Sequence, residues 1–175
     1  MSRLFALRLL PFALGLILAA GCSHYELGTG AKLGFSTVYI EPVAIQAQIP
    51  QAREIISTQL REAFSRDGRV TLVNSAEEAD VTLRVVLTDY RRDQASARED
   101  DTGLARKFNL ILYASCTLHD NRGGAGGKDL LSNRPVSVQR EAFTDSGQTM
   151  SEYETLPILA ESLADEVANT VLDTW

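Results

Sequence analysis

Two long stretches of alternating side chains constrain the fold of this chain most strongly. From Val81 to Tyr90, aliphatic residues largely alternate with threonine and arginine, and a similar alternation runs from Phe108 to His119. Successive side chains of a β-strand point to opposite faces, so each stretch predicts a strand with one apolar face. The polar segment 91–107 between them is too long for a tight hairpin turn. The two stretches therefore predict a sheet that buries one face.

Two amphipathic helices are predicted to cover that face. The first begins at Pro50, since proline suits the first helical position, and ends at Gly68. The second begins near Thr155, which keeps Pro157 in the first turn, where it breaks no backbone bond. Apolar residues recur at helical spacing in both: Ala52, Ile55, Ile56, Ala63 and Phe64 in the first, and Leu159, Leu163, Val167, Val171 and Trp175 in the second.

Three further segments, 37–43, 70–73 and 136–143, read as shorter strands, and residues 120–133 read as a glycine-rich loop. The first strand, first helix and second strand suggest one right-handed crossover. The fold class is therefore predicted to be α+β. We expect a two-layer sandwich, with a mixed four- to five-stranded sheet and two helices packed on one face.

The first 21 residues are typical of a lipoprotein signal peptide. Arg3 and Arg8 precede an apolar run, Leu9 to Ala20, that is too short to span a bilayer comfortably. The segment that closes it, Leu18-Ala19-Ala20-Gly21-Cys22, resembles the bacterial lipobox, whose cysteine thiol receives a diacylglycerol before cleavage. We therefore expect lipidation of Cys22. The alternative is an ordinary signal peptide in which this cysteine has no role.

This interpretation divides the chain into a signal peptide (1–21), a lipidated tether (22–36) and a single α+β domain (37–175). Each buried methylene of an acyl chain contributes about 0.8 kcal/mol, so two or three chains anchor a protein essentially permanently. Ser23, rather than aspartate, follows the cysteine. This favours a location at the cell outer membrane, anchored by lipid on its periplasmic side.

Composition argues against several function classes. The chain has 17 basic and 23 acidic residues, a net charge of −6 that becomes −8 when Arg3 and Arg8 leave with the signal. Proteins bind nucleic acids by neutralising the phosphates with Lys and Arg. Because this chain is acidic, no nucleic-acid partner is expected. His24 lies in the tether, and the only other histidine, His119, has no cysteine partner for a zinc site. Cys116 is expected to be a small buried hydrophobe, and no metal or cofactor is expected.

No motif predicts an enzyme. The segment from Arg122 to Asp129 superficially resembles a phosphate-binding loop, but it lacks the leading glycine and the Ser or Thr after Gly127-Lys128. A flexible hairpin loop is the better interpretation. A Ser-His-Asp triad stays open as an alternative, although no serine lies in a nucleophile-elbow context. We expect a binding protein rather than a catalyst.

A resemblance to a known family is carried by the order of several segments along the chain: 21–25, 38–43, 60–64, 67–69, 78–80, 90–93 and 159–164 with the run to Trp175. In that order they resemble the LptE-type lipopolysaccharide-assembly lipoproteins. Ser23 replaces the usual glycine, and the loop 123–127 is enlarged. The resemblance implies a small lipoprotein that plugs the lumen of the outer-membrane β-barrel LptD, helps it fold and assists lipopolysaccharide transport to the outer leaflet.

A second interpretation is a periplasmic accessory lipoprotein that activates a peptidoglycan synthase or assists a lipid-transporting ABC system. A synthase activator must reach through the cell wall on a long tether. The predicted tether has only about a dozen residues and reaches at most about 40 Å. This favours a partner close to the membrane.

Four basic residues would meet at one end of the sheet if the two long strands pair: Arg91 and Arg92 at the end of one, Arg106 and Lys107 at the start of the other. Facing like charges destabilise a sheet, so an offset is expected. One candidate is the set of nearby acids, Asp93, Glu99, Asp100 and Asp101. The other is a phosphate of lipopolysaccharide, for which arginine offers a planar fork.

Overall fold

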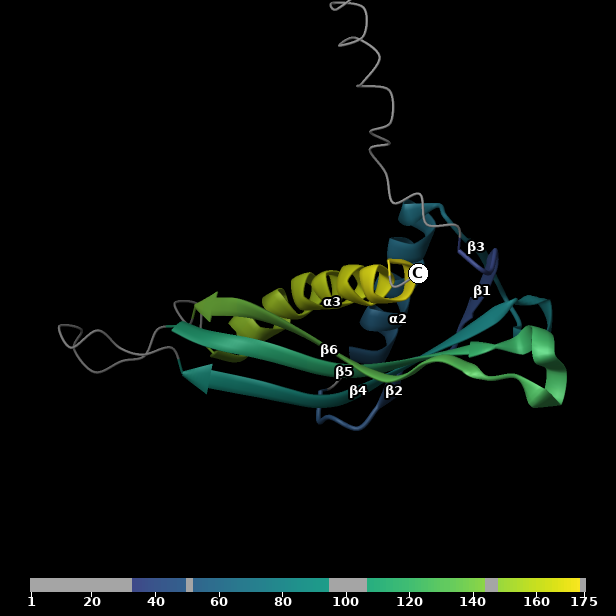
Figure 1. The fold of residues 1–175 in the computed structure, drawn as a ribbon. Helices are drawn as coiled ribbons and strands as arrows, with labels where there is room; N and C mark the ends of the chain where they lie inside the picture. Colours follow the sequence, from purple (N-terminus) through teal and green to yellow (C-terminus); the bar gives the residue numbers. More distant parts are fainter. Residues whose placement is uncertain (1–32, 50–51, 95–106, 144–147, 174–175) are drawn as a thin grey trace, which may run out of the picture. The chain divides into compact units, whose positions relative to one another are not determined.

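The computed structural model describes residues 33–49, 52–94, 107–143 and 148–173. These residues form a mixed sheet of six strands and two α-helices, drawn in Figure 1. The α+β class is therefore confirmed, with six strands where four to five were predicted. The strands are β1 (Thr37–Ile40), β2 (Ala44–Ile45), β3 (Thr71–Val73), β4 (Val81–Gln94), β5 (Lys107–Asp120) and β6 (Asp129–Phe143).

The sheet has a short parallel part and a long antiparallel part. Its strand order is β3-β1-β4-β5-β6, and β2 pairs with β4 beside that path. Strand β1 is parallel to both β3 and β4, as a strand–helix–strand crossover requires. Strands β4, β5 and β6 form an antiparallel meander. The described core therefore rests on three long strands, with the crossover added at one end.

The predicted first strand, 37–43, is shorter in the structure, and a second short strand follows it. Strand β1 stops at Ile40, and the backbone N–H of Glu41 makes one more bond to the Leu83 carbonyl at 3.0 Å. Pro42 follows and has no N–H to donate, so the ladder is interrupted there. Pairing resumes at Ala44 as β2.

Each of the three long strands extends beyond its predicted boundaries at one end or both. Strand β4 continues to Gln94, with one irregularity in its pairing between Leu87 and Asp89. Strand β6 begins at Asp129, so the loop predicted over 120–133 shrinks to a 3-10 turn, η3 (Asn121–Gly126). The Asp120 side chain accepts a hydrogen bond from the Arg122 N–H, and Gly124 adopts a φ of +57°. These two features let the chain reverse sooner than composition suggested.

Helix α2 (Ala52–Asp67) ends as predicted. Gly68 adopts a φ of +74°, and its N–H bonds to the Phe64 carbonyl at 3.3 Å. A residue without a Cβ takes this left-handed conformation at no steric cost.

The predicted start of the second helix is wrong. Helix α3 (Gln148–Leu172) begins seven residues before Thr155 and contains Pro157 in its interior. Pro157 is exposed, while Leu156 and Leu159 beside it are buried. The carbonyl that loses its partner can therefore be hydrated, and burial of the adjacent leucines offsets the cost of the proline.

One hydrophobic core lies between the sheet and the two helices. Figure 1 shows α3 running along β5 and β6, with α2 crossing near its C-terminal half. The largest side chains of the core are fully buried. They come from both helices and from one face of the sheet, which we call the helix-side face: Ile56, Leu60, Phe64, Leu83, Leu87, Leu110, Leu112, Leu118, Leu159, Leu163 and Leu172.

Candidate functional site

Strands β4 and β5 pair as neighbours. The prediction that basic residues meet at one end of the sheet requires this pairing. In the β4–β5 register Arg91 lies opposite Ile111 and Arg92 lies opposite Leu110. Adjacent residues of a strand point to opposite faces. Leu110 is buried in the core, so Arg92 shares the helix-side face, while Arg91 lies on the other face, which we call the outer face. The structure therefore places the two arginines apart.

On the outer face, Arg91 lies beside an acid and an aromatic ring. Its Nε donates to Asp89 Oδ2 at 2.8 Å, and its guanidinium carbon lies 5.2 Å from the centroid of the Tyr113 ring. The hydrogen bond to Asp89 raises the pKa of Arg91, which keeps its charge at every physiological pH. Its side chain is 61% exposed, so an anion in solution can reach it.

Arg92 and Lys107 have different surroundings. The guanidinium carbon of Arg92 lies 5.6 Å from the Phe108 ring centroid. Lys107 lies on the outer face, and its Nζ contacts Glu141 Oε1 at 2.6 Å across β5 and β6. Arg91 is paired with the residue four places after Lys107, so their backbones are about 13 Å apart along the strand. Arg91 and Lys107 therefore occupy separate positions on the outer face.

Several predicted residues lie outside the described parts of the chain: Cys22, Arg106 and the loop acids Glu99, Asp100 and Asp101. Among described residues, the acids that pair with the cations come from the strands themselves. Asp89 pairs with Arg91 and Glu141 pairs with Lys107.

A polar pocket at the opposite end of the outer face was not foreseen from the sequence. It has a volume of about 370 Å³. His119 Nδ1 lies 2.9 Å from Asp129 Oδ1, and Arg84 donates two hydrogen bonds to Glu41 at 2.8 and 3.2 Å. Its lining residues are far apart in the sequence, and the tertiary structure brings them together: Glu41, Ala76, Thr82, Arg84, Thr117, His119, Asn121 and Asp129.

The groups around His119 are not arranged as a catalytic triad. Ser132 Oγ contacts Asp129 Oδ2 at 3.4 Å, so the hydroxyl meets the acid rather than the imidazole. Nucleophilic catalysis needs the hydroxyl on the base. Within the parts of the chain that the structure describes, no group of three or more His, Cys, Asp or Glu side chains could hold a metal ion.

Hydrogen bonds connect Asp80, just before β4, to the start of β1. Its Oδ2 accepts from Ser36 N at 2.7 Å, Ser36 Oγ at 2.9 Å and Thr37 N at 3.1 Å. The backbone N–H of Asp80 in turn donates to Thr37 Oγ1 at 2.8 Å. The bond from the Ser36 N–H is the main reason that the pKa of Asp80 lies below its usual range. Nearby, Arg122 donates to the Gly34 carbonyl and to Asp120.

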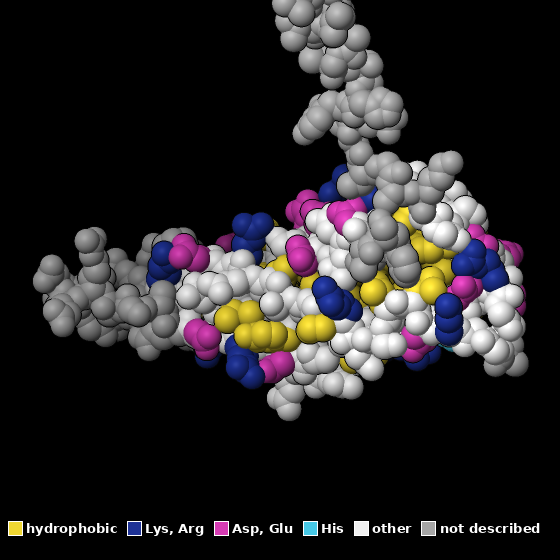
Figure 2. All heavy atoms as spheres, viewed as in Figure 1, with side chains coloured by type: hydrophobic (Ala, Val, Ile, Leu, Met, Phe, Trp, Pro, Cys, Tyr) yellow, Lys and Arg dark blue, Asp and Glu magenta, His cyan; other side chains and the backbone are white. Residues whose placement is uncertain are grey.

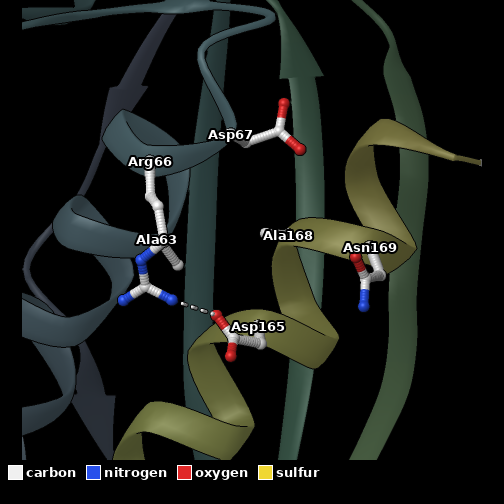
Figure 3. A pocket seen from close by; sticks show the side chains of 6 residues that line it. All are labelled: Ala63, Arg66, Asp67, Asp165, Ala168 and Asn169. Atoms are coloured by element: carbon white, nitrogen blue, oxygen red, sulfur yellow. Dashed lines mark hydrogen bonds and ion pairs between the residues drawn. The ribbon is translucent and has the colours of Figure 1, made fainter. Parts of the chain in front are cut away.

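A shallow groove of about 360 Å³ separates the two helices. Figure 3 shows Arg66 of α2 and Asp165 of α3 pointing toward each other across it, at 3.3 Å. Their side chains are 57% and 48% exposed, so this ion pair contributes at most about 1 kcal/mol. Ala63 and Ala168 also line the groove.

The fold and these sites together define a small α+β domain with polar groups along the outer face of its sheet. No helix among the described residues is both long and apolar enough to cross a membrane.

The solved structures that resemble this domain include three bacterial proteins. A lipoprotein B of uncharacterized function from Nitrosomonas europaea is 21% identical, with a TM-score of 0.51 over 81% of this chain and 82% of that one.

A minor lipoprotein from Acinetobacter baumannii is 16% identical, with a TM-score of 0.53 over 79% of this chain and 94% of that one. The hypothetical protein CT253 from Chlamydia trachomatis is 10% identical, with a TM-score of 0.53 over 78% and 95%. At these identities the structures show the fold alone.

The family is shown by sequence. The chain belongs to the LptE lipopolysaccharide-assembly family, whose model matches residues 35–171. This is a family of accessory lipoproteins without enzymatic activity. A comparison with curated protein sequences gives no significant match.

Proposed function

We propose that this protein is an outer-membrane lipoprotein that occupies the lumen of the LptD β-barrel. There it helps the barrel to assemble and assists the transport of lipopolysaccharide to the outer leaflet. The observation that carries the proposal is the family match, which spans nearly the whole described domain, residues 35–171. Acyl chains on Cys22 hold the domain at the periplasmic side of the membrane.

The proposal includes a contact between lipopolysaccharide and the cationic end of the sheet. Arg91 and Lys107 share the outer face, and their backbones lie about 13 Å apart along the strand. Each can therefore meet a different phosphate, with Arg91 offering a planar fork and Lys107 a point charge. Both exchange an existing carboxylate partner, Asp89 or Glu141, for the phosphate.

Affinity purification of the tagged full-length protein from membranes tests the main proposal. We expect the barrel to co-purify, and we expect depletion of the lipoprotein to lower both folded barrel and surface lipopolysaccharide. If depletion leaves both unchanged and impairs cell-wall synthesis instead, a peptidoglycan-synthase activator is the correct function.

The anchor has its own test. Cys22→Ala should leave an unprocessed or mislocalised precursor because the thiol that receives the lipid is missing. Ser23→Ala is the matched control and should be processed normally. Normal outer-membrane fractionation of the Cys22→Ala protein would contradict the lipidation proposal.

Substitution of two arginines on opposite faces of the sheet tests the lipopolysaccharide contact. Arg91→Gln should weaken lipopolysaccharide binding by about three- to tenfold at low salt, and less at high salt, because an exposed charge-assisted contact is screened. Arg92→Gln removes the same charge from the helix-side face and should have a smaller effect. Equal losses from both variants would mean that general charge, and not the outer face, attracts the lipid.

A further inference from the structure

We propose that the outer face of β4, β5 and β6 is the docking surface for a β-sheet of the partner protein, with uncharged polar side chains opposite it. This inference rests on the proposed function, in which the partner is a barrel with a polar interior wall. Barrel interiors of outer-membrane proteins are generally polar. The inference adds which side of this domain meets that wall. Arg91, on β4 beyond its pairing with β2, and Lys107, the first residue of β5, stay at the border of that side, where lipopolysaccharide can reach them.

The first observation is a band without charge along β5 and β6. On β5 the outer-face residues from Asn109 to Thr117 are all uncharged and half-buried, and on β6 the outer-face residues Pro135, Ser137 and Gln139 are uncharged and exposed. Ile111 and Tyr113 lie in the middle of the band. In Figure 2 hydrophobic side chains gather over this part of the domain, with acidic and basic side chains beside them.

The second observation is that polar or charged groups at three points on the border of the band contact partners within the domain. Asp89 and Arg91 pair along β4, and Lys107 pairs with Glu141 at one end. At the other end His119 lies against Asp129. A partner surface therefore does not need opposite charges to match them. This is the arrangement of a protein interface, with few charges at its centre and polar groups at its rim.

The shape of the face selects a sheet as the occupant. Three strands about 4.8 Å apart and about 45 Å long give an area of about 600 Å² without a groove along its middle. A helix would need a groove, whereas two sheets pack face to face about 10 Å apart. The area approaches the roughly 800 Å² per partner of a standard interface.

The polarity of the band disfavours a second copy of this chain. Homodimer interfaces are more apolar than other interfaces. The band is instead rich in hydroxyl and amide groups, from Asn109, Ser115, Thr117, Ser137 and Gln139. A different protein is therefore the better occupant.

The test is photo-crosslinking in cells with the full-length protein. A photoreactive phenylalanine analogue is placed at Ser115 or Ser137 on the outer face, and at Thr58, an exposed residue of α2, as the control. We expect adducts to the barrel from both serine positions and few from Thr58. Adducts from Thr58 alone, or adducts from the serines only to a second copy of this chain, would overturn the inference.

A charge placed in the band gives an independent measurement. Ser137→Glu should lower the amount of co-purified barrel by about tenfold or more, because an unpaired charge would be buried at the interface. Thr58→Glu adds the same charge to the exposed side of α2 and should leave the amount unchanged. Thermal unfolding of both variants should match the wild type, which excludes misfolding as the cause.

The outcomes separate this inference from the proposed function. If the wild-type protein captures the barrel and Ser137→Glu captures as much, the docking surface is wrong while the function stands. If the wild-type protein captures no barrel, and Ser115 and Ser137 cross-link to another envelope protein, the function is wrong while the docking surface stands.

Discussion

The hydrogen bonds of Asp80 make the start of the domain sensitive to a single substitution. One carboxylate oxygen accepts three hydrogen bonds, from Ser36 N, Ser36 Oγ and Thr37 N, at 2.7 to 3.1 Å. Asp80→Ala removes the acceptor and leaves two backbone N–H groups without it. The bond from the Asp80 N–H to Thr37 Oγ1 remains, because it belongs to the backbone.

The size of the effect follows from these contacts. A hydrogen bond to a charged group contributes about 1.5–3 kcal/mol, but Ser36 is exposed and water can replace part of what is lost. We therefore expect Asp80→Ala to destabilise the β1 segment by about 2 kcal/mol. At about 1.4 kcal/mol for each factor of ten, its local opening should become about 30-fold more frequent.

The effect depends on pH in a defined direction. Hydrogen bonds from Ser36 and Thr37 hold the pKa of Asp80 below its usual value of 3.8. A carboxyl whose pKa is lowered by folding stabilises the folded state above its unfolded pKa and loses that contribution as pH falls through its folded pKa. The difference in unfolding free energy between wild type and Asp80→Ala should therefore be constant from neutral pH to about pH 5 and shrink below about pH 4.

Hydrogen exchange of the β1 amides measures how often this segment opens. Denaturant unfolding at each pH measures the free energy of unfolding. Asp165→Ala is the matched control, since it removes an exposed ion pair with Arg66 that contributes at most about 1 kcal/mol. If Asp80→Ala leaves exchange of β1 no faster than Asp165→Ala does, the reasoning about the Asp80 hydrogen bonds is refuted.

Three further predictions concern the core and the turn after β5. Phe64→Ala should lower the free energy of unfolding by about 3–5 kcal/mol in denaturant titration, because the ring is fully buried; a loss under 1 kcal/mol would contradict this packing. Gly127→Ala should destabilise the domain by about 1–3 kcal/mol, since a Cβ there would lie 2.3 Å from the Asp120 carbonyl oxygen; Gly126→Ala meets no atom within 4 Å and should be close to neutral. Cys116 should resist thiol reagents at neutral pH until the domain unfolds, because burial raises its pKa to about 11; rapid labelling of the folded protein would show an accessible thiol.

Features that depend only on residues close together in the sequence could be predicted from it. The alternation from Phe108 to His119 predicted β5 because side-chain direction in a strand depends only on position along it. Gly68 predicted the end of α2 because it is the residue that adopts the left-handed conformation without strain. Pro157 misled the prediction because the gain from packing Leu156 and Leu159 is a property of the tertiary structure.

Features that depend on strand register were decided only by the tertiary structure. Arg91 and Arg92 are adjacent in sequence, yet they lie on opposite faces and meet different partners, Tyr113 and Phe108. Asp80 bonds to Ser36 across 44 residues, a pairing that no local pattern contains. A one-residue change of register would exchange the two faces of a strand, so the docking surface exists only once the strands have paired.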